Sequence, residues 1–237
     1  MLDDVRALTF DVFGTVVDWR SSLIREGQAL GASKGLVHVD WVKFADAWRG
    51  LYQPQLDRVR SGALPWTKLD DLHRQSLDRL LVDFGIRGLS EAEIDELNRA
   101  WHRLDPWPDA VPGLTRLRRR FVLATLSNGN VALMVNMARR AGLPWDAILG
   151  AEVAQAYKPQ PKAYLHTAAL LGLQPAQCLM VAAHNNDLKV ATGLGFRAAF
   201  VARPTEYGSQ QTKDLKPEGP WDVVATDFGD LARQLGC

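Results

Sequence analysis

Four groups of polar residues in the sequence could carry chemistry, because each stands where an apolar run ends or a helix-like segment begins. They are Asp11, Ser127-Asn128-Gly129, Lys158-Pro159 and His184-Asn185-Asn186-Asp187. Any one of them by itself is typical of a turn or of a helix cap. Their joint occurrence, in this order along the chain, indicates a functional site rather than four unrelated turns.

Short apolar runs rich in strand formers position these groups. The runs are Val5 to Phe10, Phe121 to Leu126, Cys178 to Ala183 and Ala198 to Val201. Helix-like segments separate them, and this alternation is typical of a parallel sheet covered by helices on both faces. The sequence therefore predicts an α/β fold with a Rossmann-like, doubly wound parallel sheet. Ligands of such sheets bind outside the carboxyl ends of the strands, where the polar groups fall.

The segment from residue 19 to residue 103 shows amphipathic helical patterns and no convincing strand. Its apolar residues recur at helical spacing, and Ser90 followed by Glu93 predicts the capped start of a helix. We therefore expect a helical domain over 19–103, inserted after the first strand, and a core domain formed by 1–18 and 104–237. We also expect a hinge at 104–113 and a surface loop at 203–220.

The composition excludes several classes of partner. The 237 residues include 28 Lys and Arg against 27 Asp and Glu, so there is no broad basic field for nucleic acid. The two cysteines, Cys178 and Cys237, suggest neither a disulfide framework nor a zinc site. No apolar run approaches the roughly 20 residues of a membrane span, and no signal-like start is visible. We expect a cytoplasmic protein that binds a small molecule.

The order of the four polar groups resembles the haloacid dehalogenase superfamily. Its members share a Rossmann-like core with an Asp nucleophile, a Ser or Thr, a Lys and a final acidic motif. The resemblance covers nearly the whole chain, and the helical insert matches the cap domain of the family. Most members are magnesium-dependent phosphatases, with Asp-x-Asp in the first motif and two acidic residues in the last.

Two positions of this chain depart from the phosphatase pattern. Phe13 stands where phosphatases have their second Asp, and Ala183 stands four residues before Asp187, where the other acidic metal ligand is expected. Magnesium prefers several oxygen ligands, and the remaining Asp11 and Asp187 would bind it poorly. The sequence therefore predicts no metal and no other cofactor.

The pattern instead resembles the metal-independent (S)-2-haloacid dehalogenases, whose first motif reads Asp, any residue, aromatic, Gly-Thr. Trp48-Arg49, Ser127-Asn128-Gly129 and Lys158-Pro159 with Tyr164 match further positions of this subfamily. The resemblance implies hydrolysis of short 2-haloalkanoic acids, haloacetates among them, to 2-hydroxy acids through an ester on Asp11. Direct displacement implies inversion at carbon 2 and a preference for the S enantiomer. The halogen, fluoride included, and the chain length stay open.

The same resemblance implies catalytic roles for several residues. Asp11 is the expected nucleophile, and Thr15 orients it through a hydrogen bond. Lys158 keeps Asp11 ionised, because a nearby cation lowers the pKa of a carboxyl group. Asp187, paired with Lys158, is the expected base or water holder for hydrolysis of the ester.

A second set of residues is expected to bind the substrate, whose anionic charge requires preplaced donors. The amides of Val12 and Phe13, together with Ser127, are expected to hold the substrate carboxylate. Arg49 and Asn128 are expected to receive the halide. Tyr164 completes the set of substrate-binding residues.

His184 departs from the subfamily pattern, since many of these enzymes have Ser-x-Asn where this chain has Ala182-Ala183-His184. One interpretation is a purely structural imidazole. The other is a catalytic one, because an imidazole with a pKa near ~6.5 can take a proton at neutral pH and so assist ester hydrolysis.

Two other functions stay open at this point. One is a phosphatase or phosphonatase-like hydrolase on the same scaffold, which would depend on magnesium. The other is a non-catalytic protein that holds a small carboxylate between cap and core. The expected partner is a small anionic 2-haloacid, with no nucleic-acid or membrane partner, and a homodimer is expected by analogy with the family.

Overall fold

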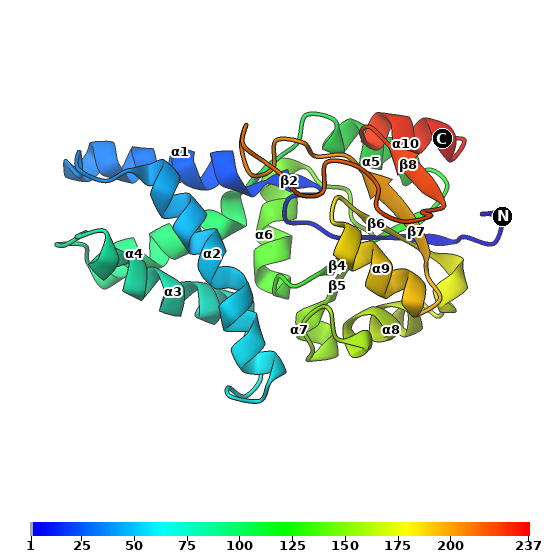
Figure 1. The fold of residues 1–237 in the computed structure, drawn as a ribbon, viewed down its shortest axis with the longest axis horizontal. Helices are drawn as coiled ribbons and strands as arrows, with labels where there is room; N and C mark the ends of the chain where they lie inside the picture. Colours follow the sequence, from blue (N-terminus) through cyan, green and yellow to red (C-terminus); the bar gives the residue numbers. More distant parts are fainter. Residues whose placement is uncertain (1) are drawn as a thin grey trace.

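A six-stranded parallel sheet forms the centre of the protein in the computed structural model, which describes residues 2–237 (Figure 1). The strand order is β5-β4-β1-β6-β7-β8. The strands are β1 (Ala7–Phe10), β4 (Val122–Ser127), β5 (Ala147–Gly150), β6 (Cys178–Ala182), β7 (Arg197–Val201) and β8 (Val223–Ala225). β1 pairs with both β4 and β6, so the residues that follow these three strands meet at one edge of the sheet.

Helices cover both faces of this sheet, which confirms the predicted fold class. α5 (Ala110–Leu117), α6 (Val131–Ala141) and α10 (Phe228–Gln234) pack on one face, while α8 (Pro161–Leu170) and α9 (Asn185–Gly193) pack on the other. Side chains of a strand alternate between the two faces. In β6, Leu179 and Val181 contact the first group of helices, and Met180 contacts the second. Two short elements, α7 (Ala151–Ala154) and η2 (Pro175–Gln177), complete this part of the chain.

The four strands predicted from apolar runs are present within a few residues of their expected bounds. β5 and β8 were not predicted. Both lie at an edge of the sheet, and they have only four and three residues. Their apolar runs, Ala147 to Leu149 and Val223 to Ala225, have only three residues each, shorter than any of the predicted runs, which explains why the sequence did not reveal them.

Residues 19–103 form an all-helical region beside the sheet (Figure 1). Its elements are α1 (Trp19–Lys34), α2 (Trp41–Arg60), α3 (Leu69–Asp83), α4 (Glu91–Asn98) and η1 (Arg99–Arg103). Ser90 and Glu93 form the predicted capping box at the start of α4. Where the chain enters and leaves this region, β2 (Val17–Asp18) pairs with β3 (Asp105–Pro106) in an antiparallel ribbon.

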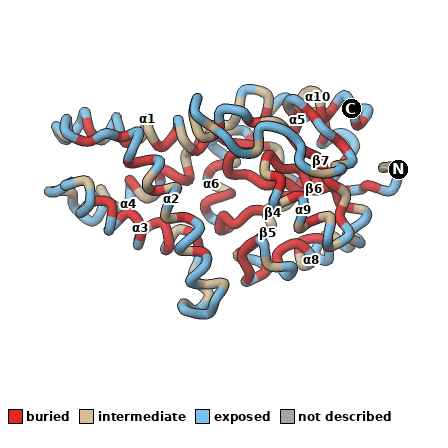
Figure 2. Tube along the Cα trace, in the orientation of Figure 1, coloured by how far each residue is buried: buried red, intermediate tan, exposed pale blue. Residues whose placement is uncertain are grey.

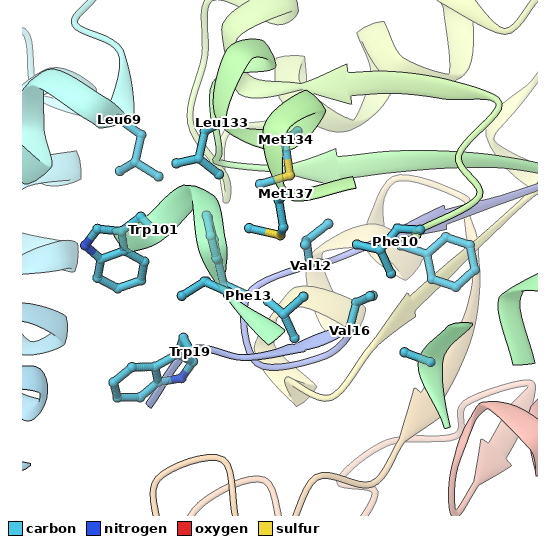
Figure 3. Close-up of a cluster of buried hydrophobic side chains, with 14 of the residues drawn as sticks. Phe10, Val12, Phe13, Val16, Trp19, Leu69, Trp101, Leu133, Met134 and Met137 are labelled. Atoms are coloured by element: carbon cyan, nitrogen blue, oxygen red, sulfur yellow. The ribbon is translucent and has the colours of Figure 1, made fainter. Parts of the chain in front are cut away.

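Aromatic side chains join the helical region to the sheet. Phe13 packs edge-on against Trp101 of η1 and against Tyr52 of α2, with ring centroids 5.8 and 6.4 Å apart (Figure 3). Met134 and Met137 of α6 belong to the same buried cluster. Buried residues accordingly continue from the strands into the helical region (Figure 2). This packing holds α2 over the edge where β1, β4 and β6 end.

The irregular segment 203–220 is only partly the surface loop predicted from its sequence. Lys213 and its neighbours are exposed, but Arg203 and Glu206 are buried. The Arg203 guanidinium donates to the carbonyl of Thr15 and forms two hydrogen bonds with Asp109. These contacts hold the start of the segment beneath the turn that follows β1, so the prediction was wrong for this part. Among residues 2–237, no helix is both long and apolar enough to cross a membrane.

Candidate active site

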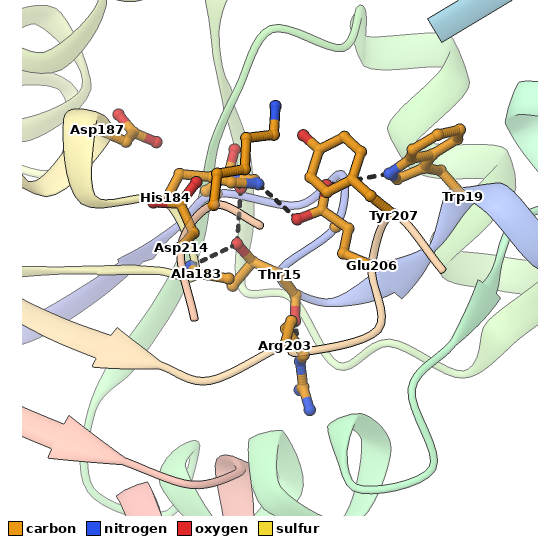
Figure 4. A network of polar contacts seen from close by, with 12 residues as sticks. Thr15, Trp19, Ala183, His184, Asp187, Arg203, Glu206, Tyr207 and Asp214 are labelled. Atoms are coloured by element: carbon orange, nitrogen blue, oxygen red, sulfur yellow. Dashed lines mark hydrogen bonds and ion pairs between the residues drawn. The ribbon is translucent and has the colours of Figure 1, made fainter. Parts of the chain in front are cut away.

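Asp11 lies at the carboxyl end of β1, and both oxygens of its buried side chain have hydrogen-bond partners. Oδ1 accepts from Lys158 Nζ at 2.9 Å, and Oδ2 accepts from Thr15 Oγ1 at 2.7 Å. Nδ1 of His184 lies 3.0 Å from the same Oδ2. The Ala183 amide in turn donates to Thr15 Oγ1, which fixes this hydroxyl (Figure 4). Three of the other four predicted catalytic residues thus contact Asp11 directly, and the fourth, Asp187, contacts Lys158.

A tight turn follows Asp11 and leaves two amides unused. The amides of Val16 and Val17 both donate to the carbonyl of Val12. Within residues 2–237, the amides of Val12 and Phe13 donate to no protein acceptor. These neighbouring N–H groups are therefore available to an anion.

Lys158 and its partners form one side of the site. Lys158 Nζ also donates to Asp187 Oδ2 at 2.5 Å, and Tyr164 Oη donates to Asp187 Oδ1 at 2.5 Å. The Asn128 side-chain oxygen accepts from the Lys158 amide, which fixes the loop that carries the lysine. Arg60, at the end of α2, donates to the Lys158 carbonyl and ties the helical region to the same loop.

His184 and Glu206 form the other side. Nε2 of His184 lies 2.8 Å from Glu206 Oε2, and Trp19 Nε1 donates to Glu206 Oε1 at 3.0 Å (Figure 4). Glu206 is only 1% exposed. No pattern in the sequence indicated Glu206, which belongs to the irregular segment 203–220 and to no recognisable motif.

The charges of the site alternate in sign, and their pKa values follow from this arrangement. Burial raises the pKa of Asp11, but the charges of Lys158 and His184 outweigh burial and hold it well below its usual range. Burial lowers the pKa of Lys158, and the carboxylates of Asp11 and Asp187 more than reverse this effect. Asp11 is therefore ionised and Lys158 a permanent cation near neutral pH.

Burial and neighbouring charges also oppose each other at His184, Glu206 and Asp187, and together they set the pKa values of these groups. Burial lowers the pKa of His184, but Glu206 and Asp11 raise it well above the ordinary value of 6.5. Burial raises the pKa of Glu206, and His184 and Arg49 bring it below the ordinary value. Burial raises the pKa of Asp187 in spite of its contact with Lys158. His184 is therefore an imidazolium in the free protein.

A cavity of about 1120 Å³ lies over these groups, between the sheet edge and α2. Asp11, Lys158, His184 and Asp187 line it, together with Arg49 and Tyr52 of α2 and with Tyr207 and Lys213 of the segment 203–220. The Arg49 guanidinium lies over the Tyr52 ring, 4.3 Å from its centroid. Within the described part of the chain, its buried Nη1 has no hydrogen-bond partner. A buried donor without a partner is costly, so Arg49 is suited to an anionic ligand.

The other predicted binding residues lie in the wall of this cavity or are buried beneath it. Asn128, Phe13 and Tyr164 line the cavity. Ser127 is fully buried beneath it, and its hydroxyl accepts from the Gly129 amide. The Val12 side chain is also fully buried, so only its amide is positioned for a ligand.

The residues present do not fit the magnesium ion used by most proteins with this arrangement of motifs. Lys158 Nζ lies between the carboxylates of Asp11 and Asp187, at 2.9 and 2.5 Å, and neutralises the charge that would attract a cation. Phe13 and Ala183 supply no oxygen ligand from their side chains. Two carboxylates already bridged by an ammonium group are a poor set for a hard, octahedral cation.

The structure is an α/β fold in which a buried aspartate follows the first strand of a parallel sheet and contacts a buried lysine. The family of haloacid dehalogenase-like hydrolases matches residues 5–195, and the chain belongs to this family. The chain is also similar to two solved structures that cover nearly all of it. One, a defluorinating L-2-haloacid dehalogenase, is 49% identical with a TM-score of 0.96, and the match covers 98% of this chain and 96% of that chain.

The second of these structures, an L-2-haloacid dehalogenase, is 51% identical with a TM-score of 0.95, and the match covers 98% and 99% of the two chains. Among characterised proteins, the (S)-2-haloacid dehalogenase of Xanthobacter autotrophicus is 28% identical over 208 residues. That match covers 84% of this chain and 76% of the relative.

Proposed function

We propose that this protein is a 2-haloacid dehalogenase, a hydrolase that converts short 2-haloalkanoic acids to 2-hydroxy acids through an ester on Asp11. The observation that carries the proposal is the bridge from Lys158 Nζ to Asp11 and Asp187, at 2.9 and 2.5 Å. This bridge keeps the nucleophile ionised without a metal. The names of the relatives that share nearly the whole chain support the same reaction.

Attack on the substrate requires that two anions approach each other. The unused amides of Val12 and Phe13 offer donors for the substrate carboxylate, next to Asp11 in the chain. An oxygen of Asp11 then forms a bond to carbon 2, and the carbon–halogen bond breaks with its electron pair on the halide. Preplaced positive charge lowers the cost of bringing these charges together.

Arg49 is the proposed receptor of the leaving halide, together with Asn128. The Arg49 guanidinium lies 4.3 Å from the centroid of the Tyr52 ring and 5.4 Å from that of the Trp19 ring. Its Nη1 has no hydrogen-bond partner among the described residues and remains free for a ligand. Asn128 uses its oxygen for the Lys158 amide, which leaves its side-chain N–H groups for the cavity. Both groups donate hydrogen bonds, which a departing anion needs.

Water then cleaves the ester, and two groups beside Asp11 are candidates for activating it. Asp187 lies beyond Lys158 on one side, and His184 lies 3.0 Å from Asp11 Oδ2 on the other. Hydrolysis at the carboxyl carbon of Asp11 restores the enzyme, so the oxygen incorporated from water resides first in Asp11.

We include fluoroacetate among the proposed substrates. A carbon–fluorine bond requires strong donors at the leaving group, and Arg49 offers a buried donor with no competing partner among the described residues. The 49% identical structure is named as a defluorinating enzyme, which supports this choice.

We also propose that residues 19–103 act as a cap domain over a core of 1–18 and 104–237. Arg49 and Tyr52 of this region line the cavity. Arg60, on the same helix, donates a hydrogen bond to the carbonyl of Lys158. The cytoplasmic location and the homodimer stay predictions.

Halide release from fluoro-, chloro- and bromoacetate, with and without a chelator, tests the proposal. We expect release that the chelator does not affect, and none from an Asp11→Asn variant. Phosphatase activity that requires magnesium, without halide release, would establish the rival hydrolase instead.

The covalent route has its own test. During a single turnover in heavy-oxygen water, the first product should carry unlabelled oxygen while Asp11 becomes labelled. Label in the first product would exclude the ester and favour direct attack by water.

A further inference from the structure

His184 is held between two carboxylates, one on each ring nitrogen. Nδ1 lies 3.0 Å from Asp11 Oδ2, and Nε2 lies 2.8 Å from Glu206 Oε2. A carboxylate can only accept, so each nitrogen must carry a proton if both hydrogen bonds are made. Asp11 and Glu206 are the charged groups in contact with the ring. Beyond them lie Lys158, bonded to Asp11, and Arg49, whose charge acts on Glu206.

Two features of the structure fix the Glu206 side chain in this position. Trp19 Nε1 donates to its second oxygen, at 3.0 Å. Gly14, in the turn after Asp11, has no side chain, and a Cβ atom there would lie 2.1 Å from Glu206 Oε1. The glycine of the first motif therefore makes the room that Glu206 occupies.

We infer that Glu206 is a positioning residue for ester hydrolysis, which holds His184 through Nε2 so that Nδ1 can act as the base toward the water that attacks esterified Asp11. The inference rests on the proposed function and deepens it. It assigns the water-activating role to His184 and gives Glu206, outside every recognised motif, a part in the second half of the reaction.

Esterification of Asp11 changes the state of His184. When Asp11 forms its bond to carbon 2 and the halide departs, the carboxylate loses its negative charge. The imidazolium then loses the negative charge that stabilised its Nδ1 proton and releases that proton to solvent through the cavity. Glu206 continues to accept from Nε2, which leaves the lone pair of Nδ1 directed at Asp11.

The second half of the reaction returns the proton. Water attacks the carboxyl carbon of Asp11, and one water proton passes to Nδ1. The bond from this carbon to the substrate oxygen then breaks, and the other water proton passes to that oxygen to give the hydroxy acid. Asp11 is again a carboxylate and His184 again an imidazolium, so each turnover releases one halide and one proton.

Asp187 is less suited to this role. Both of its oxygens accept from strong donors, Lys158 Nζ and Tyr164 Oη, each at 2.5 Å. Esterification of Asp11 removes neither partner. Nδ1 of His184, in contrast, lies 3.0 Å from Oδ2 of the carboxyl group that water attacks, and the preceding step frees it from its proton.

The test is a single turnover of bromoacetate by wild-type enzyme and by Glu206→Gln, with enzyme in excess. Acid-quenched samples give the halide and, by intact mass, the Asp11 ester over time, and therefore the rate constants for ester formation and decay. Gln keeps the shape of Glu206 and an oxygen that can accept from Trp19. Glu218→Gln makes the same change at an exposed position of the segment 203–220 and is the matched control.

We expect ester formation by Glu206→Gln within about threefold of wild type and ester decay slower by about 10- to 100-fold, the range of general-base catalysis. Glu206→Asp, which keeps the charge, should recover part of this loss. The rise of the decay rate with pH should also move to lower pH in Glu206→Gln, by about one unit, because a carboxylate beside an imidazole raises the imidazole pKa.

Unchanged decay with an unchanged pH profile would overturn the inference and leave the proposed function intact. Equal losses in formation and decay would make Glu206 a structural residue and would overturn it as well. If wild-type enzyme gave neither halide nor ester, the proposed function itself would fail.

Discussion

Two buried histidines lie in different regions of this protein and have opposite surroundings. His184, beside the sheet, has a carboxylate against each ring nitrogen. His73, in α3 of the helical region, is 2% exposed, and both of its ring nitrogens lack a hydrogen-bond partner among residues 2–237. Its ring stacks on Trp101 at a centroid distance of 4.2 Å.

The surroundings give the two rings different charge states near neutral pH. Burial lowers the pKa of His73 to about 3, so this ring is neutral near pH 7. Burial acts in the same direction on His184, but Glu206 and Asp11 overcome it and raise its pKa well above the ordinary value. Burial alone thus does not determine the charge of a histidine. The partners of its nitrogens decide, and here they favour the charged form of His184 and leave His73 neutral.

The largest expected difference between the two rings is in turnover. His184→Asn keeps a donor for Asp11 but has no base, and we expect kcat with chloroacetate to fall by about 100-fold with a smaller change in KM. His73→Phe keeps the stacking on Trp101 and should leave kcat within about twofold of wild type. Steady-state kinetics of both variants measure this difference in kcat. Similar losses of kcat in both variants would contradict the distinction between the two rings.

The next largest effect is acid destabilisation through His73. Its pKa is lower in the folded state, about 3, than in the unfolded state, near ~6.5, so its stabilising contribution is present above pH ~6.5 and lost as the pH falls toward 3. At pH 5 the loss from this residue is about 2 kcal/mol. The free energy of urea unfolding should therefore fall less for His73→Phe than for wild type between pH 7 and pH 5. Parallel curves would show that His73 is not buried as a neutral ring.

His184 should give the opposite pH dependence. Its pKa is raised in the folded state, so its contribution is fully present below the unfolded pKa and lost as the pH rises through the folded pKa. Above pH ~6.5, wild type should lose about 1.4 kcal/mol per pH unit relative to His184→Asn, until the folded pKa is passed. Urea unfolding of both proteins from pH 6 to pH 9 measures this slope. No difference in slope above pH ~6.5 would mean that His184 is neutral in the free protein.

The smallest expected effect is a gain in stability at neutral pH. A buried ring with two unpaired nitrogens loses its hydrogen bonds to water without replacement. His73→Phe should therefore raise the free energy of unfolding at pH 7.5 by about 1 kcal/mol. His38→Phe, at an exposed position of the same helical region, is the control and should show no gain. A loss of stability in His73→Phe would indicate that the imidazole has a polar partner.

The local patterns of the sequence predicted much of the fold and of one side of the site. The apolar runs that form β1, β4 and β6 are patterns of residues that are neighbours in the sequence, and so is the capping box of Ser90 and Glu93. Asp11, Lys158 and Asp187 were found because each belongs to a motif at a strand or helix end. Phe13 and Ala183 showed by their side-chain types alone that oxygen ligands are missing.

The tertiary structure alone decided the other side of the site. Glu206 follows His184 by 22 residues, in a segment without periodicity or motif, and it reaches the histidine only because Arg203 and Trp19 hold that segment beneath the turn after β1. The sequence showed a histidine close to Asp187 in the last motif, which could be structural or catalytic. Whether that histidine is charged depends on contacts between residues far apart in the chain, which form only when the segments that carry them pack together.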